Sequence, residues 1–291
     1  MVTTQTGAIG EVLCQVARYH CGIKGVAMDK IARWAKNAKP KQQLCISEKN
    51  MRRVQALLQP RKRLALLNLP LVLMREAEDG RLRPRAAALL AMYGVALDIL
   101  LVFPMRRANL AALHLDRHLQ RLDTRSRLVN FITLAKDETK TEKAMLWPLP
   151  VDVATRLEGY LKQHRPQLAT SGNRYLFPDT GTGGRLAHDM AVYMTELVER
   201  RTGCEFNLHL IRHFVVALFL ERHPGQYDTA RLILGHAKSS YTIAVYDGLG
   251  AMAAARQLDT VLTHERGAAA ILPPRPTRKR PSRPRKPGHG G

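Results

Sequence analysis

Hydrophobic residues recur at helical spacing along most of the chain. The pattern over residues 10–58 predicts short helices, interrupted by a basic, polar segment at residues 36–41. A second helical region begins at Arg61-Lys62-Arg63. Helical spacing resumes at Val151, and amphipathic helices are predicted to about Leu262. The pattern therefore predicts a mainly helical protein.

One segment departs from this pattern. Residues 128–134 and 144–147 are short apolar runs on either side of a polar turn at 136–143. Two such runs joined by a polar turn are typical of a β-hairpin, and no other convincing hairpin or internal repeat is present. The predicted fold class is therefore mainly α with a small antiparallel β-sheet (α+β).

The charge of the chain adds a class of partner. The 46 Lys and Arg residues against 24 Asp and Glu give a formal net charge of +22. Seven of the basic residues lie after residue 271 with no acidic residue among them, so the remainder of the chain keeps +15 of that charge. Lys and Arg that neutralise phosphates release counterions, which favours binding to a polyanion. Nucleic acid is the leading candidate.

An anionic membrane is the competing partner. Residues 86–103 form an apolar stretch long enough to be considered as a membrane span, but the stretch contains Asp98. An acidic side chain near the centre of a spanning helix costs about 2.5–3.5 kcal/mol on insertion scales. We therefore predict a buried core helix here and no membrane partner, and residues 1–10 lack the basic start and apolar run of a signal peptide.

The sequence contains no pattern for a metal or nucleotide cofactor. The four cysteines form no CxxC pair and have no histidine at zinc-finger spacing, which favours free thiols in a reducing cytosol; they are Cys14, Cys21, Cys45 and Cys204. The chain has neither a phosphate-binding loop of the GxxxxGK[ST] type nor a carboxylate cluster for two metal ions. No cofactor is therefore expected.

The densest polar cluster lies at the start of an apolar helix. His209, Arg212 and His213 are spaced i, i+3 and i+4, so they share one face of the helix that continues through the apolar residues 214–220. Three potential cations on one face repel one another unless an anion lies between them. The cluster therefore predicts either an anion-binding cleft or a solvated basic surface.

Four other features lie at intervals around this cluster. Leu234-Gly235-His236 ends a helix with a glycine cap, and Tyr246 follows ten residues later. Arg106 and Arg107 form a basic pair between two apolar segments, and Lys140 occupies the predicted hairpin turn. In this order, the set resembles the tyrosine recombinases, also called phage integrases, over roughly residues 61–262.

The resemblance implies a site-specific DNA recombinase or integrase of a mobile element. Such an enzyme cleaves and rejoins DNA through a 3′-phosphotyrosyl intermediate, without metal or ATP. The resemblance assigns the catalytic residues Arg106, Lys140, His209, Arg212, His236 and Tyr246. Two alternatives remain: a truncated, non-catalytic DNA-binding relative, and a swivelase similar to type IB topoisomerases.

The chemistry of the residue types agrees with these roles. Arg106 and Arg212 would bind the phosphoryl oxygens, because guanidinium groups donate two parallel hydrogen bonds. His209 would be the base that activates Tyr246, and His236 would donate to the phosphate. Lys140 would protonate the leaving 5′ oxygen.

Several positions have competitors. Arg107 competes with Arg106, and only one of the two is expected to face the cleft. Lys136 and Lys143 compete with Lys140, and Tyr241 competes with Tyr246. His213 is ranked below His209, because it could serve only to brace the helix.

The resemblance also implies domains and partners. Residues 1–58 would be part of a helical core-binding segment that clamps DNA, 59–265 the catalytic domain and 266–291 a disordered basic tail. The partner would be double-stranded DNA, bound by a homotetramer on two duplexes. The apolar residues Ala254, Leu258, Val261 and Leu262 would form a C-terminal helix exchanged between subunits. The expected location is the bacterial cytoplasm, on DNA.

Overall fold

The computed structural model describes residues 4–39, 46–122, 128–236, 242–243, 246 and 258–262. Most of these residues are helical, and they include a small antiparallel sheet of three strands. The predicted fold class is therefore confirmed. Cys45, Tyr241, Ala254 and the predicted tail at 266–291 lie outside the described residues.

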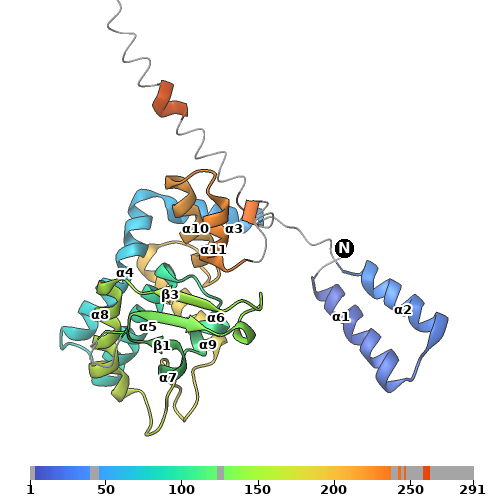
Figure 1. Ribbon diagram of the computed structural model, residues 1–291, viewed down its shortest axis with the longest axis horizontal. Helices are drawn as coiled ribbons and strands as arrows, with labels where there is room; N and C mark the ends of the chain where they lie inside the picture. Colours follow the sequence, from blue (N-terminus) through green and yellow to red (C-terminus); the bar gives the residue numbers. More distant parts are fainter. Residues whose placement is uncertain are drawn as a thin grey trace, which may run out of the picture.

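The N-terminal residues form a helical pair that Figure 1 shows apart from the rest of the protein. Helix α1 (Thr4–Gln15) continues into the π-helical turn η1 (Val16–His20), and α2 (Gly25–Asn37) packs back against α1. The two helices approach closely at Gly10, where an added Cβ would lie 3.1 Å from the Cα of Ala35. Glycine therefore permits this contact.

The core of the larger part begins with three helices. They are α3 (Glu48–Leu58), α4 (Pro60–Glu78) and α5 (Pro84–Val102). Val54 and Leu57 of α3 are fully buried in the same apolar core as α4 and α5. The division of the chain at residue 58 stays a prediction, but this packing favours a boundary before α3.

Helix α5 is the apolar stretch that could also have been a membrane span. Among the described residues it is the one helix long and apolar enough to cross a membrane, yet 67% of its 18-residue apolar window is buried inside the protein. Its one acidic residue, Asp98, accepts a hydrogen bond from Arg156 at 2.5 Å. The predicted core helix is thus confirmed, with its charge paired in the interior.

The sheet and two short helices follow α5. They are α6 (Arg107–Ala111), α7 (Leu115–His118), β1 (Leu119–Gln120), β2 (Phe131–Leu134), the 3-10 turn η2 (Lys136–Glu138) and β3 (Met145–Pro148). The strand order is β1-β2-β3, with Ile132 opposite both Leu119 and Trp147. The predicted hairpin is β2 with β3, whereas β1 was not predicted.

The remaining helices surround the sheet and the core (Figure 1). They are α8 (Val151–Gly159), the turns η3 (Tyr160–His164) and η4 (Arg165–Gln167), α9 (Ala187–Thr202), α10 (Leu210–Arg222) and α11 (Tyr227–Leu234). Helix α10 packs against α3, α5 and α11. The first turn of α10, which contains Arg212, therefore lies among these packed helices.

Candidate active site

Arg212 lies at the centre of the candidate site. Its side chain is only 6% exposed, and its guanidinium donates to the backbone oxygens of Pro104 and Leu234, the latter at 2.9 Å. Pro104 precedes α6 and Leu234 ends α11, so one side chain joins segments that are distant in sequence. These bonds fix the plane of the guanidinium, which suits the binding of an oxyanion.

A cleft of about 740 Å³ opens beside this guanidinium. Arg106, Arg107, His209 and Arg212 line one side, and α9 contributes His188 and Glu196 to the other. Both arginines of the 106–107 pair line this cleft, so the expectation that only one would do so is wrong. Arg106 is the one that also contacts a second, small cavity with Arg212 and Thr139. The structure thus brings Arg106, His209 and Arg212 together.

Tyr246 lies behind this cleft, in contact with His213. The hydroxyl oxygen of Tyr246 is 2.9 Å from Nδ1 of His213, and Tyr246 is only 1% exposed. The ring of His213 also meets that of His209 edge-on, with centroids 5.0 Å apart. His213 therefore connects the tyrosine to the cleft. Sequence reasoning ranked His213 below His209 as a residue that could serve only to brace the helix, and the spacing of the two histidines does not show which of them contacts Tyr246.

His236 follows the glycine cap that the sequence predicted. Gly235 has a φ of 62°, in the left-handed region that ends helix α11. An added Cβ at Gly235 would lie 2.8 Å from Sδ of Met145, so the cap also packs closely against β3. Nδ1 of His236 is 3.1 Å from the hydroxyl oxygen of Thr242, a buried residue that sequence reasoning did not identify.

Lys140 is exposed on the hairpin turn and, within the described residues, forms no hydrogen bond or ion pair with the other candidate residues. The turn itself is anchored nearby: Thr139 is buried and Asn109 of α6 donates to the backbone oxygen of Glu138 at 2.7 Å. Lys136 and Lys143 are also exposed. The choice of Lys140 therefore stays a prediction.

The three histidines share an electrostatic environment. Burial lowers the pKa of His213 to about 3, and the nearby His209 and Arg212 add to the effect. Burial, with the charges of Arg212 and Arg106, lowers the pKa of His236 to about 4, and the pKa of His209 is lowered for the same reasons. The rings are therefore neutral at pH 7 and can accept protons. An anion between them would favour their protonated forms.

These shifts predict that the protein loses stability in mild acid. The unfolded histidines titrate near 6.5, above the folded values of about 3 for His213 and about 4 for His236. Unfolded chains thus bind protons first, so the free energy of unfolding should be constant above pH 7 and fall from pH 6.5 toward pH 4. Urea unfolding at pH 7.5, 6.0 and 5.0 measures this decrease.

A matched variant isolates the contribution of the site. His114 and His164 also have a lowered pKa, so they contribute to the same decrease. His213→Asn should therefore reduce the decrease between pH 7.5 and 5.0. An equal decrease in wild type and His213→Asn would contradict the electrostatic description.

No family model matches the sequence. No curated protein matches it.

Within the described residues, no group of three or more His, Cys, Asp or Glu could hold a metal ion.

Solved structures of recombinases and an integrase have a similar general arrangement. XerA recombinase is 15% identical with a TM-score of 0.43, covering 82% of this chain and 77% of its own. XerH site-specific recombinase bound to its difH substrate is 12% identical with a TM-score of 0.46, and the match covers 80% of this chain and 65% of the XerH chain. The Tn1549 transposon integrase in complex with a circular intermediate DNA is 14% identical with a TM-score of 0.41, and the match covers 84% of this chain and 81% of the integrase chain.

Proposed function

We propose that this protein is a tyrosine-type site-specific DNA recombinase or integrase. The observation that carries the proposal is the hydrogen bond between Tyr246 and His213, beside a cleft lined by Arg106 and Arg212. A phenol with a pKa near 10 is a poor nucleophile unless a neighbouring group accepts its proton. Here a neutral imidazole contacts the hydroxyl directly, and the guanidiniums lie where a phosphate would enter.

In the proposed reaction, the Tyr246 oxygen attacks a phosphorus of the DNA backbone. Its proton passes to Nδ1 of His213, while Arg106 and Arg212 bind the phosphoryl oxygens that gain charge. The bond between phosphorus and the 5′ oxygen breaks, and Lys140 protonates that oxygen. The DNA then ends in a 3′-phosphotyrosyl bond, and the 5′ hydroxyl of a second strand can reverse the attack. The phosphotyrosyl bond keeps the energy needed for rejoining.

DNA binding is expected to precede and enable this attack. Because Tyr246 is buried, its hydroxyl reaches a phosphate only after the side chain turns toward the cleft. A phosphate bound by Arg212 and Arg106 would also counteract the charges that depress the pKa of His213, and so make that ring a better proton acceptor. His209, which lines the cleft, and His236 would then contact the phosphate.

The overall charge and the C-terminal residues support the proposed partners. A net charge of +22 favours binding to double-stranded DNA. Leu258, Val261 and Leu262 are helical and exposed, which suits a helix that docks on a neighbouring subunit. A homotetramer on two duplexes, acting on DNA in a bacterial cytoplasm, is the assembly that we propose.

The proposed function predicts a covalent complex of wild-type protein with DNA. Duplexes tiled across the DNA that flanks the gene, each nicked so that the short fragment released with a free 5′ hydroxyl diffuses away, should trap a complex that resists SDS. Strand exchange between two duplexes should accompany it. A protein that binds one of these duplexes tightly without a covalent complex would be a non-catalytic relative, and relaxation of supercoiled DNA without strand exchange would indicate a swivelase.

A further inference from the structure

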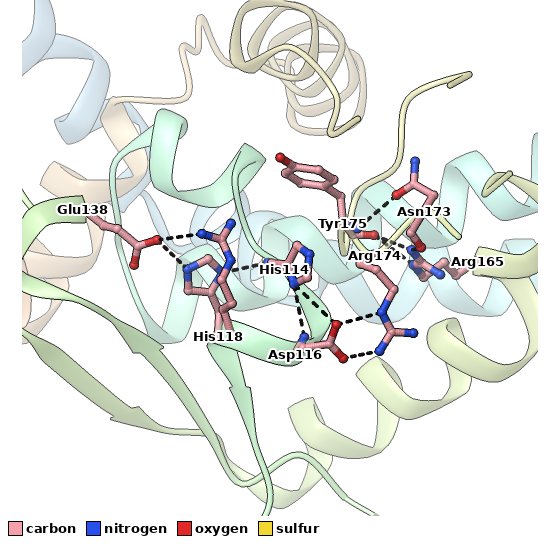
Figure 2. Close-up of polar contacts among 9 residues, drawn as sticks. His114, Asp116, His118, Glu138, Arg165, Asn173, Arg174 and Tyr175 are labelled. Atoms are coloured by element: carbon pink, nitrogen blue, oxygen red, sulfur yellow. Dashed lines mark hydrogen bonds and ion pairs between the residues drawn. The ribbon is translucent and has the colours of Figure 1, made fainter. Parts of the chain in front are cut away.

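The hairpin turn that carries Lys140 is held by polar bonds of Glu138 (Figure 2). One carboxylate oxygen of Glu138 accepts from the backbone nitrogen of Ala135 at 2.9 Å. The other lies 2.8 Å from Nε2 of His118, and the backbone oxygen of Glu138 accepts from Asn109 at 2.7 Å. Lys140 is two residues further along the turn. Glu138 therefore links this turn to α7 and to the helix that follows Arg106.

The direction of the bond between His118 and Glu138 follows from the other ring nitrogen. Nδ1 of His118 accepts from the backbone nitrogen of His114 at 2.7 Å, so the neutral ring carries its hydrogen on Nε2. That hydrogen is donated to the carboxylate. His118 is only 3% exposed, and its ring cannot rotate without losing both bonds. It therefore fixes the position of the Glu138 side chain.

The segment that carries His118 is itself rigidly attached. Asp116 forms an ion pair with Arg174, and the backbone nitrogen of Leu115 donates to the backbone oxygen of Arg174 at 2.9 Å. Arg165 in turn donates to the backbone oxygen of Tyr175, as Figure 2 shows. These bonds form a continuous series from η4 to the hairpin turn. They hold the segment that carries His118 in place.

Packing alone does not hold the turn on this side. A groove of about 440 Å³ lies beside the hairpin and is lined by His118, Glu138 and Ala135. A turn next to open space can shift unless directional bonds prevent the movement. The Thr139 hydroxyl bonds to Lys136 and Lys143 within the turn, whereas the bonds of Glu138 to His118 and Asn109 attach the turn to other elements.

We propose that Glu138, oriented by His118, is a positioning residue that holds the Lys140 ammonium at the leaving 5′ oxygen. This inference rests on the proposed function. Lysine has a long flexible side chain, so the backbone of the turn decides which volume the ammonium can reach. A general acid contributes about 10²–10⁴-fold to a rate, and a misplacement of about 1 Å can cost much of that.

The test compares two leaving groups with one variant. In Glu138→Gln, the amide nitrogen cannot accept, so either Ala135 or His118 loses its acceptor, and the ion pair with Arg117 is also lost. We expect covalent complex formation on ordinary DNA to slow by roughly 10- to 100-fold. On DNA in which sulfur replaces the bridging 5′ oxygen, the leaving thiolate needs no proton, and the variant should react at the wild-type rate. Glu142→Gln, the same change at an exposed position of the turn, is the control.

A second pair of variants covers the case in which Glu138→Gln does not fold. The terminal nitrogen of His118→Gln can replace Nε2 as donor to Glu138, whereas His118→Asn is too short to reach it. The first should stay near wild type and the second should slow on ordinary DNA only. In a Lys140→Ala background, Glu138→Gln should slow the reaction no further.

The outcomes separate the two proposals. Equal slowing of Glu138→Gln on oxygen and sulfur substrates, or no slowing on either, would overturn the positioning role. Further slowing in the Lys140→Ala background would also overturn it. If wild-type protein forms no covalent complex on either substrate, the proposed function itself fails.

Discussion

Tyr246→Phe is expected to abolish the covalent complex with DNA. Phenylalanine keeps the buried ring but removes the attacking oxygen, so the rate should fall to background, a loss of roughly 10⁴-fold or more. The lost hydrogen bond to His213 should cost only about 1 kcal/mol of stability. DNA binding should therefore be nearly unchanged. A gel-shift titration and an SDS-resistant complex, measured on the same nicked duplex, check both expectations.

One matched change accompanies this prediction. Tyr241→Phe, at the other candidate nucleophile, should leave the covalent complex intact. If the complex instead persists in Tyr246→Phe and disappears in Tyr241→Phe, our choice of nucleophile is wrong.

The histidines can be distinguished in the same assay. His213 contacts the hydroxyl of Tyr246 directly, so His213→Asn should slow the reaction by roughly 10²-fold or more. His209→Asn removes a residue that lines the cleft and should have a smaller effect. A larger loss in His209→Asn than in His213→Asn would return the role of base to His209.

The fold was predictable where the hydrophobic pattern is long. Helix α5 follows from a long apolar stretch, and the hairpin of β2 with β3 follows from two apolar runs on either side of a polar turn. Strand β1 has two residues, Leu119 and Gln120, and two positions show no alternation. Its pairing with β2 depends on α7 bringing it there, which is a tertiary effect.

The site was predictable as a set of residues and less so as a set of contacts. The family resemblance selected Arg106, Arg212 and His236, and the structure places Arg106 and Arg212 in the lining of one cleft. The bond between His213 and Tyr246 joins residues 33 positions apart, so no local spacing could have selected His213 over His209. Likewise, Glu138 and His118 lie on different elements, and only folding brings them together.

Arg212→Lys is expected to remove both activity and part of the stability. The guanidinium of Arg212 donates to two backbone oxygens, of Pro104 and Leu234, and lines the cleft that a phosphate would enter. A lysine ammonium is one point charge that cannot replace this geometry. We expect covalent complex formation to fall by roughly 10²- to 10³-fold, as for loss of a donor to an oxyanion. Stability should fall by about 1–3 kcal/mol, because a buried carbonyl loses its partner.

Thermal unfolding and the covalent complex assay, run together, separate the two effects. Arg222→Lys is the matched control, because Arg222 lies exposed at the end of the same helix α10 and should tolerate the change. If stability falls while the folded variant cleaves at the wild-type rate, Arg212 serves only to join α11 to the segment before α6. If both fall, the same guanidinium that joins these segments also binds the phosphate.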